Sequence, residues 1–382
     1  EMTRFAATAR WEKPQGKAAP IVLEKHWSIL PVGVALAIGC NTFPPWNSSS
    51  GIFASLATGN PVIVKPHPAA ILPLALTVQV LRAVLAEAGL PADAVLLAVD
   101  APGAAITRAL ATRPEVKLLD YTGSGQFGAW LRENARHAQI FSEEAGVNTM
   151  TLAATDDFAG MCANVAFSLA LYSGQMCTAP QNIYVPAGGI ETEAGHKSFD
   201  EVAAGIVAAM DGLLSDPARA EGVLGRIANP ATLDRLQAAR GFGRVLREPV
   251  IAGRLASPLI VALNDGDAAA ESECFGPVAF VVAVPDADAG IARGADLARR
   301  KGAITAALHD TDEARIARAI AAFGGAGVNL SINLTGNIFV NQSAAFSDFH
   351  VTGANPAGTA SLTDTAFITP RFRLVMWRRP IR

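Results

Sequence analysis

The stretch Ser173-Gly-Gln-Met-Cys177 decides how the rest of this chain is interpreted. It follows an apolar segment that has the pattern of a helix. Upstream, a carboxylate opens the string Glu143-Glu-Ala-Gly146, and downstream lies Glu273-Cys-Phe-Gly-Pro277. A lone cysteine in apolar surroundings is usually a small buried hydrophobe. A thiol that shares a site with a carboxylate, however, supplies both the nucleophile and the general base of covalent catalysis.

The region before Lys65 carries two candidate amides. Asn41 begins Asn41-Thr-Phe-Pro44, and Asn47 ends Pro45-Trp-Asn47. An amide N–H can stabilise the oxyanion that forms when a nucleophile attacks a carbonyl group. Both asparagines are therefore candidates for an oxyanion-binding residue.

The order and spacing of these motifs resemble the aldehyde dehydrogenase superfamily, from about Pro31 to the C-terminus. The resemblance implies that Cys177 attacks an aldehyde carbon and forms a thiohemiacetal. It also implies that a glutamate activates the water that hydrolyses the thioester. The family's Glu-Leu-Gly-Gly-Lys is replaced here by Glu143-Glu-Ala-Gly-Val-Asn148, so Glu144 is a second candidate. Alignment of Asn148 and the spacing to Cys177 favour Glu143 as the base.

The resemblance also chooses between the two amides. Asn41 lies 24 residues before Lys65, which is close to the family's spacing, whereas Asn47 lies only 18 residues before it. We therefore predict that Asn41 and the backbone N–H of Cys177 hold the oxyanion.

A glycine-rich turn, Gly123-Ser-Gly-Gln-Phe-Gly128, predicts where a cofactor binds. It matches the dinucleotide fingerprint literally, but it follows the third or fourth predicted strand rather than the first. It better resembles the family's Thr-Gly-Ser turn. In that case the amides of Gly123 and Ser124 face a pyrophosphate at a helix N-terminus.

Other cofactor contacts are implied by the resemblance alone. Lys65 reaches the adenosine ribose, while Glu273 and Phe275 hold the nicotinamide ribose and ring. Pro68 stands where the family often has an acid that binds the 2′-hydroxyl of NAD. With His67 beside Lys65, a 2′-phosphate meets no repulsion, so we predict NADP, with NAD as the alternative.

Composition excludes several classes of protein. The net charge of −3 provides no basic field for nucleic acid. The apolar run before Val64 contains prolines and asparagines, which do not suit a membrane span. The four cysteines and six histidines show no ligand spacing, so we predict no metal and histidines that are structural or exposed. Few cysteines in a long chain suit the cytoplasm.

Strands alternate with helices along the chain, which predicts an α/β fold with parallel sheets. The resemblance implies a Rossmann-like cofactor domain and a second α/β catalytic domain. We expect domains at 1–146 and 147–340, and a tail at 341–382 with an oligomerisation strand in 372–377. Predicted strands lie at 61–65, 94–99, 116–121, 139–142, 181–185, 277–284 and 304–308. Predicted helices lie at 71–88, 103–112, 126–137, 157–174, 198–214, 230–240, 288–300 and 311–323.

The tail indicates a branch of the family. Its Val340–Gly353 and Asn355-Pro-Ala-Gly358 resemble the PaaN-type dehydrogenases of phenylacetate catabolism. These oxidise a CoA-linked semialdehyde. The chain is also shorter than the family at its N-terminus, so we expect a fragment whose full-length form is a homo-oligomer. The alternative functions are a reductase that makes aldehydes from CoA thioesters or acyl phosphates, and a non-catalytic cofactor-binding relic.

Overall fold

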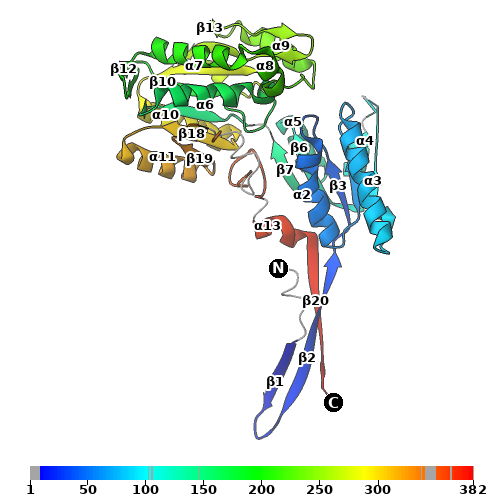
Figure 1. The fold of residues 1–382 in the computed structure, drawn as a ribbon. Helices are drawn as coiled ribbons and strands as arrows, with labels where there is room; N and C mark the ends of the chain where they lie inside the picture. The colour runs from blue at the N-terminus through cyan, green and yellow to red at the C-terminus, as the bar shows by residue number, and fades with distance from the viewer. Residues whose placement is uncertain are drawn as a thin grey trace. The chain divides into compact units, whose positions relative to one another are not determined.

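The computed structural model describes residues 9–101, 103–104, 106–144, 146–336, 338–339, 350–361 and 364–381. The chain forms two compact units. Unit 1 contains Glu1–Thr122, Gln126–Ser142 and Asp364–Arg382, and unit 2 contains Gly123–Gly125 and Glu143–Thr363. The chain thus leaves unit 1 to build unit 2 and returns to unit 1 for its last segment (Figure 1).

Unit 1 is built on a five-stranded sheet in the order β5-β4-β3-β6-β7. β3 pairs in parallel with β4 and β6, and β4 with β5. The inner strands are apolar and buried, as expected when helices cover a parallel sheet. The strands are β3 (Val34–Ile38), β4 (Val62–Lys65), β5 (Val95–Leu97), β6 (Val116–Gly123) and β7 (Gln139–Glu144). The helices between them are α2 (Pro44–Ala57), α3 (Ile71–Glu87), α4 (Ile106–Ala111) and α5 (Gly125–Asn134).

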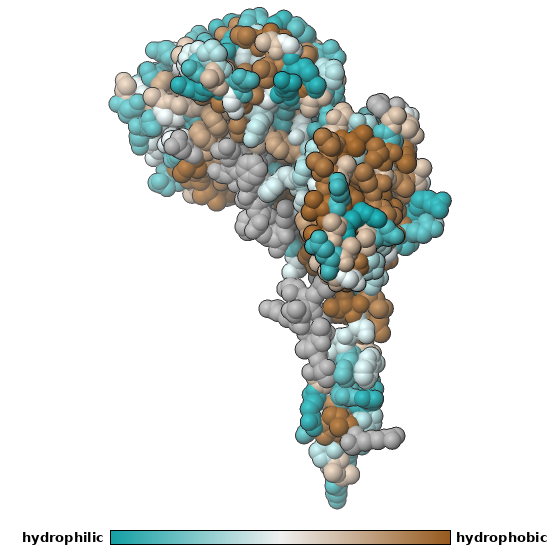
Figure 2. All heavy atoms as spheres, turned by 45° about the vertical axis from the view of Figure 1, so that its right-hand side comes forward, coloured by the Kyte–Doolittle hydropathy of each residue, from teal (hydrophilic) through white to brown (hydrophobic). Residues whose placement is uncertain are grey.

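Helix α3 exposes an apolar stripe. Leu72, Leu76, Val80 and Val84 recur every fourth residue, so they share one face of the helix, and each is more than half exposed. Figure 2 shows apolar side chains gathered on the part of unit 1 that carries this helix. Such a contiguous apolar surface is typical of an interaction site.

A second sheet of unit 1 is antiparallel and joins distant parts of the chain. It has the order β1-β2-β20, with β1 (Ala9–Gln15), β2 (Ala18–Pro31) and β20 (Phe372–Pro380). β2 pairs with β20 from Leu23↔Pro380 to Pro31↔Phe372. The predicted strand at 372–377 is therefore confirmed, and its partner within this chain is β2.

Arg371 anchors this last segment to the five-stranded sheet. Its guanidinium is fully buried and forms two contacts with Asp120, at 2.5 and 2.9 Å. It also donates to Ser55 Oγ and stacks on the rings of Phe141 and Phe367. α13 (Thr365–Ile368) supplies the Phe367 carbonyl oxygen that accepts from Nε. A buried guanidinium with all these partners holds the C-terminal segment against β6.

Unit 2 is built on a seven-stranded sheet in the order β13-β16-β17-β10-β8-β18-β19. Neighbouring strands of this sheet run parallel, except that the edge strand β13 runs antiparallel to β16. The strands are β8 (Thr149–Leu152), β10 (Asn182–Pro186), β13 (Arg244–Arg247), β16 (Leu259–Asn264), β17 (Val278–Val284), β18 (Thr305–His309) and β19 (Asn329–Ile332). Small additional strands are β9 (Ala154–Thr155), β11 (Ile190–Thr192), β12 (Gly195–Lys197), β14 (Ile251–Ala252) and β15 (Leu255–Ala256).

Helices of unit 2 begin at residues that cap them. Asp157, Asp286 and Asp312 each accept hydrogen bonds from N–H groups of the first turn, and Ser198 forms a capping box with Glu201. The helices are α6 (Phe158–Ala170), α7 (Phe199–Leu214), α8 (Pro217–Val223), α9 (Ala231–Ala239), α10 (Ala287–Lys301) and α11 (Glu313–Gly325).

The predicted α/β fold is confirmed, but some of its elements differ from the prediction. The elements that were not predicted include strands β8, β13, β16 and β19 of the seven-stranded sheet and helices α2 and α8. The helix expected at 157–174 ends at Ala170, because the chain then turns into a left-handed conformation. The tail motif 340–349 lies outside the described residues. Among the described helices, none is long and apolar enough to cross a bilayer.

Candidate active site

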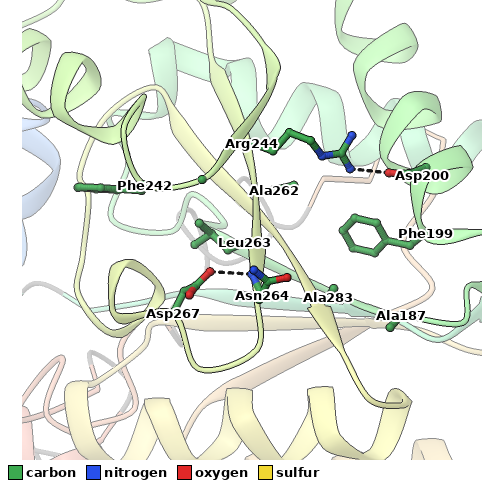
Figure 3. Close-up of a pocket in the computed structure, with 11 residues that line it drawn as sticks. Ala187, Phe199, Asp200, Phe242, Arg244, Ala262, Leu263, Asn264, Asp267 and Ala283 are labelled. Carbon is green, nitrogen blue, oxygen red and sulfur yellow. Dashed lines mark hydrogen bonds and ion pairs between the residues drawn. The ribbon is translucent and has the colours of Figure 1, made fainter.

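Unit 2 contains a pocket that lacks the predicted chemistry. It has a volume of about 540 Å³ and is lined by residues of β13, β16, β17 and α7 (Figure 3). Its charged groups are already engaged: Arg244 pairs with Asp200 at 2.5 Å, and Asp267 accepts from the N–H of Asn264 at 2.7 Å. No lining residue is a cysteine or a histidine, so this pocket offers no thiol nucleophile.

The turn that carries Cys177 is strained. Tyr172 and Ser173 have φ values of 51° and 56°, and Gly174 has 63°. Non-glycine residues in this left-handed region cost about 1–3 kcal/mol each, and they persist only where their surroundings fix them. Here Ser173 Oγ donates to the Gly225 carbonyl, and the Gln175 side chain donates to the carbonyls of Tyr172 and Arg226. These bonds fix the path of the chain into Cys177.

Gly174 brings two of the predicted motifs together. A Cβ atom at this position would lie 2.4 Å from the Gly276 carbonyl oxygen, so only glycine permits this approach. The Cys177 turn is therefore in close contact with the Glu273–Pro277 segment. The structure thus joins two stretches that are about a hundred residues apart in sequence.

Asn148 connects the nucleophile's turn to the sheet. Its Nδ2 donates to the carbonyls of Cys177 and Ala179, at 2.7 and 3.0 Å. Its Oδ1 accepts from the N–H groups of Ile304 and Thr305. Because Asn148 is buried and directly precedes β8, this one amide ties the Cys177 turn to both β8 and the start of β18.

The two candidate bases point in different directions, as neighbours in a strand do. A carboxylate oxygen of Glu143 lies within 4.8 Å of Cys177 Sγ. Glu144 is buried, and its Oε2 faces the turn before α5, 3.6 Å from where a Cβ of Gly125 would be. The geometry therefore brings Glu143, and not Glu144, to the thiol.

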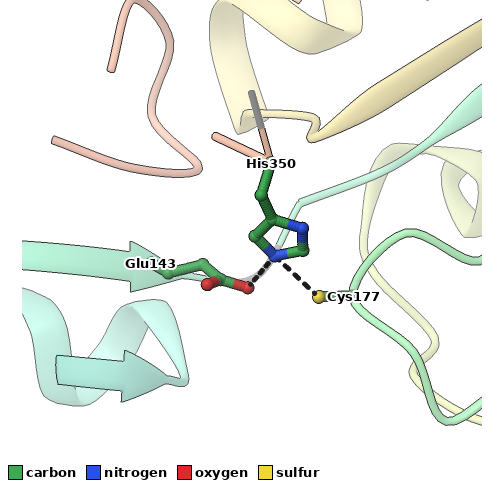
Figure 4. Close-up of side chains that lie close together, drawn as sticks. All are labelled: Glu143, Cys177 and His350. Carbon is green, nitrogen blue, oxygen red and sulfur yellow. Dashed lines mark hydrogen bonds and ion pairs between the residues drawn. The ribbon is translucent and has the colours of Figure 1, made fainter. Parts of the chain in front are cut away.

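A histidine that the sequence analysis did not assign to the site completes this cluster. His350 Nε2 lies 2.9 Å from Glu143 Oε1 and 3.4 Å from Cys177 Sγ (Figure 4). The expectation that every histidine is structural or exposed missed this residue. His350 is buried, with 3% of its side chain exposed, so it is held at the site rather than in solvent.

The tail loop positions His350 by packing along the strand that carries the base. Glu144 N–H donates to the Ala357 carbonyl at 2.7 Å, and Glu143 forms an isolated bridge with Gly358. The Asn355 side chain donates to the carbonyls of Ala303 and Gly327. These contacts place 350–361 beside the end of β7, although this segment lies far along the chain from Glu143.

The other cysteines have different environments. Cys162 is buried in α6, and burial raises the pKa of its thiol to about 12. Burial also raises the pKa of Cys274, which is only partly exposed. Cys40 is partly exposed, and its thiol donates to Asn47 Oδ1. Cys162 is therefore a core residue, whereas Cys40 and Cys274 are half-buried.

The predicted residues of unit 1 lie at the carboxyl ends of its strands. Asn41 follows β3, and Asn47 lies in α2. Lys65 ends β4, is buried, and forms an ion pair with Asp100 at 2.6 Å. Burial and the charge of Lys65 lower the pKa of the neighbouring His67. Ligands of open parallel sheets bind at this edge.

The remaining cofactor candidates lie in unit 2. Gly123 and Ser124 join β6 to α5, so the predicted strand–turn–helix context is present. Burial raises the pKa of Glu273 to about 7, although Arg235 and the Gly146 N–H oppose this shift. Phe275 is half-buried, and its carbonyl accepts from Arg235.

Comparisons with known proteins agree with this arrangement. A structure of the NAD-dependent aldehyde dehydrogenase from Burkholderia multivorans is 49% identical, with a TM-score of 0.96, over 100% of this chain and 70% of that one. The alpha-ketoglutarate semialdehyde dehydrogenase of Haloferax volcanii is 30% identical over 70% of this chain and 55% of that protein. The N-succinylglutamate 5-semialdehyde dehydrogenase of Burkholderia mallei is 29% identical over the same shares.

The chain spans about half the length of these two curated relatives. The model of the aldehyde dehydrogenase family matches residues 1–346. This match extends over most of the chain and includes both the Cys177 turn and the strand that carries Glu143. The chain therefore belongs to the aldehyde dehydrogenase family.

Proposed function

We propose that the protein oxidises an aldehyde to a carboxylic acid, with NAD or NADP as the hydride acceptor and Cys177 as the covalent nucleophile. The observation that carries this proposal is the approach of a Glu143 carboxylate oxygen to within 4.8 Å of Cys177 Sγ. From this position the carboxylate could activate a water molecule for attack on an acyl group carried by the sulfur. The base can therefore act in hydrolysis without displacing the nucleophile.

The reaction has two halves. The Cys177 thiolate attacks the aldehyde carbon, and the oxyanion is held by the backbone N–H of Cys177 and the amide of Asn41. A nicotinamide cofactor held by Glu273 and Phe275 would supply the hydride acceptor, so that the carbon bound to Cys177 could become a thioester. Glu143 then removes a proton from water, the hydroxide attacks the thioester, and the thiolate leaves.

We further propose that unit 1 and the Gly123–Gly125 turn bind the cofactor, while the rest of unit 2 performs the covalent chemistry. The N–H groups at Gly123 and Ser124 suit a pyrophosphate at the start of α5. Glu273 and Phe275 are assigned to the nicotinamide ribose and ring. The contact of Gly174 with Gly276 supports this assignment, because it brings the Glu273 segment to the Cys177 turn.

The preference between NAD and NADP depends on the surroundings of Lys65. The sequence favoured NADP because no acid follows the lysine. Asp100 nevertheless supplies a carboxylate 2.6 Å from Lys65 Nζ. The pKa of His67 is lowered, so this side chain is less able to carry a positive charge. A 2′-phosphate beside Lys65 would therefore also lie near the Asp100 carboxylate, which opposes NADP, so the surroundings of Lys65 do not favour one cofactor over the other.

The substrate class we propose is a semialdehyde. The names of the relatives from Haloferax volcanii and Burkholderia mallei support this class. The finer proposal, a CoA-linked semialdehyde of phenylacetate catabolism, rests on the tail motif that ends in Asn355-Pro-Ala-Gly358. An assay of NAD and NADP reduction, with semialdehydes that do and do not carry CoA, tests both the semialdehyde class and the CoA-linked substrate.

The test of the mechanism separates acylation from hydrolysis. Cys177→Ala should abolish turnover while cofactor binding persists. Glu143→Gln should give a burst of reduced cofactor followed by slow turnover, because acylation precedes the blocked step. Glu144→Gln is the matched control and should turn over normally. A burst of reduced cofactor in the Glu144→Gln variant alone would identify Glu144, rather than Glu143, as the base.

The same experiment addresses the alternative, a reductase of CoA thioesters or acyl phosphates. Such an enzyme needs the thiol but not a hydrolytic base. The proximity of Glu143 to Cys177 favours hydrolysis, and an unchanged Glu143→Gln variant would favour the reductase.

We also propose that the protein forms a homo-oligomer. The apolar stripe of α3 and the exposed Leu374, Val375, Met376 and Trp377 of β20 support this proposal. Light scattering at micromolar concentration tests it, and a monodisperse monomer would contradict it. A cytoplasmic location is proposed because none of the four cysteines forms a disulfide.

A further inference from the structure

We propose that His350 is a catalytic residue that accepts the thiol proton of Cys177 and holds the resulting thiolate. The inference rests on the proposed role of Cys177 as the nucleophile. It adds a residue from the tail loop, for which neither the sequence motifs nor the comparisons assign a role.

The inference rests on one ring nitrogen of His350, which faces two acidic groups. His350 Nε2 lies 2.9 Å from Glu143 Oε1 and 3.4 Å from Cys177 Sγ (Figure 4). A neutral imidazole nitrogen either donates or accepts, so it can satisfy only one of these partners. An imidazolium N–H, in contrast, is attracted to a carboxylate and a thiolate at the same time.

In the proton transfer, the Cys177 S–H bond breaks and its electron pair stays on sulfur. The proton forms the Nε2–H bond of His350. The cluster then contains a thiolate, an imidazolium and the Glu143 carboxylate. A positive charge next to a thiol favours its ionised form, which is the nucleophile.

The surroundings of His350 favour this ionisation. Glu143 on β7 contacts the ring nitrogen directly and stabilises the imidazolium. Glu144, the next residue of the strand, faces Gly125. Glu273 belongs to the segment that contacts the Cys177 turn; its pKa is raised to about 7, and the Gly146 N–H is its partner. Burial alone disfavours the charged imidazole, so the direct contact with Glu143 is what stabilises the imidazolium.

The arrangement also assigns separate tasks to the two oxygens of Glu143. Oε1 accepts from His350, so the proton of the hydrolytic water goes to Oε2. The imidazolium keeps its proton through attack, hydride transfer and hydrolysis. It therefore stabilises the thiolate again when sulfur leaves the acyl carbon.

The experiment measures the reactivity of the thiol rather than turnover. The full chain, without cofactor, is alkylated with iodoacetamide from pH 5 to pH 10, and each cysteine peptide is quantified by mass spectrometry. Cys162 and Cys274 serve as internal references, because burial raises the pKa of both. We expect Cys177 of the unmodified protein to react at pH 6, well below the ordinary thiol pKa of about 8.5.

His350→Gln should slow the alkylation of Cys177 at pH 6 by about 10- to 100-fold, and its pH profile should approach that of an ordinary thiol. His309→Gln is the matched control: His309 is also buried, but it lies at the end of β18. Circular dichroism checks the folding of both variants. If His350→Gln does not fold, Glu143→Gln serves instead and should slow alkylation at pH 6 less than tenfold, because the imidazole remains.

A Cys177 profile in folded His350→Gln that matches the unmodified protein would overturn the inference. So would a Glu143→Gln variant whose thiol loses its reactivity at pH 6. Failure of the proposed function looks different: Cys177→Ala would retain turnover, whatever the alkylation profile of Cys177.

Discussion

Replacing Arg371 by Met should destabilise unit 1 more than any substitution on the exposed part of β20, the strand that follows it. The Arg371 guanidinium is fully buried and is the partner of Asp120 at 2.5 and 2.9 Å. Methionine preserves much of the side-chain volume but removes the charge. The Asp120 carboxylate, itself buried, then loses its counter-charge, and Ser55 Oγ loses a donor.

The expected magnitude follows from the geometry. Removing one partner of a buried ion pair costs about 3–5 kcal/mol, because the remaining charge stays out of water. The lost stacking on Phe141 and Phe367 adds to this cost. With a urea m-value of about 2–3 kcal/mol/M, the unfolding midpoint should fall by about 1–2 M.

Tryptophan fluorescence is the natural assay, because Trp11, Trp27, Trp46, Trp130 and Trp377 all belong to unit 1. The urea transition followed in this way therefore reports unit 1 without a contribution from tryptophans in unit 2.

Two controls define the result. Arg373→Met removes an exposed arginine of β20, and its midpoint should stay within about 0.3 M of the unmodified protein, as surface substitutions usually do. Adding Asp120→Asn to Arg371→Met should recover part of the loss, because the unpaired charge is gone. Equal midpoints for Arg371→Met and Arg373→Met would refute the reasoning.

Three further predictions concern the site. Gly174→Ala should lower kcat by about 100-fold, because a Cβ would lie 2.4 Å from the Gly276 carbonyl oxygen and displace the turn before the nucleophile. Gly212→Ala, in open space on α7, is the control, and equal kcat values for the two variants would contradict the prediction. Asp100→Asn should tighten NADP binding about tenfold and leave NAD binding unchanged, measured by titration of both cofactors; unchanged NADP binding would show that this carboxylate does not oppose a 2′-phosphate. Burial raises the pKa of Glu273 to about 7, so the negative charge of its carboxylate is lost as the pH falls through 7, and cofactor affinity should then weaken. Glu273→Gln should remove this pH dependence of cofactor binding, and a dependence that persists in the variant would point to another group.

The fold could be predicted to the extent that strand and helix periods alternate. The strands near Lys65 and at 278–284, and the helix at 71–87, follow directly from apolar runs and turn residues. β8 was missed because Thr149-Met-Thr-Leu152 is short and follows the Glu143 motif directly. β16 is a short apolar run, and such runs do not separate strands from buried helical turns.

The left-handed turn after Ala170 could not be predicted from local pattern. Leu171 and Tyr172 continue the helical periodicity of α6. Their conformation depends on contacts with Gly225 and Gly276, which lie about 50 and 100 residues away in the sequence. Tertiary contacts overrode propensity at this point.

Within the site, the proximity of Glu143 to Cys177 followed from motif spacing, whereas His350 did not. It lies 173 residues after the cysteine and reaches it only because the tail loop packs along β7. No spacing rule connects a loop histidine to a strand carboxylate. The one signal was the unusual tail around Asn355-Pro-Ala-Gly358, which marked the segment but assigned no role to His350.

The return of the chain to unit 1 has a consequence for biosynthesis. A ribosome makes Asp120 early, then all of Glu143–Thr363, and only afterwards Arg371 and β20. All strands of the seven-stranded sheet are therefore available before the guanidinium that neutralises Asp120 exists. Unit 2 can fold on the ribosome, while unit 1 keeps an incomplete sheet and an uncompensated carboxylate until Arg371 and β20 are made. Chains arrested before Asp364 should accordingly contain a protease-resistant unit 2 and a protease-sensitive unit 1.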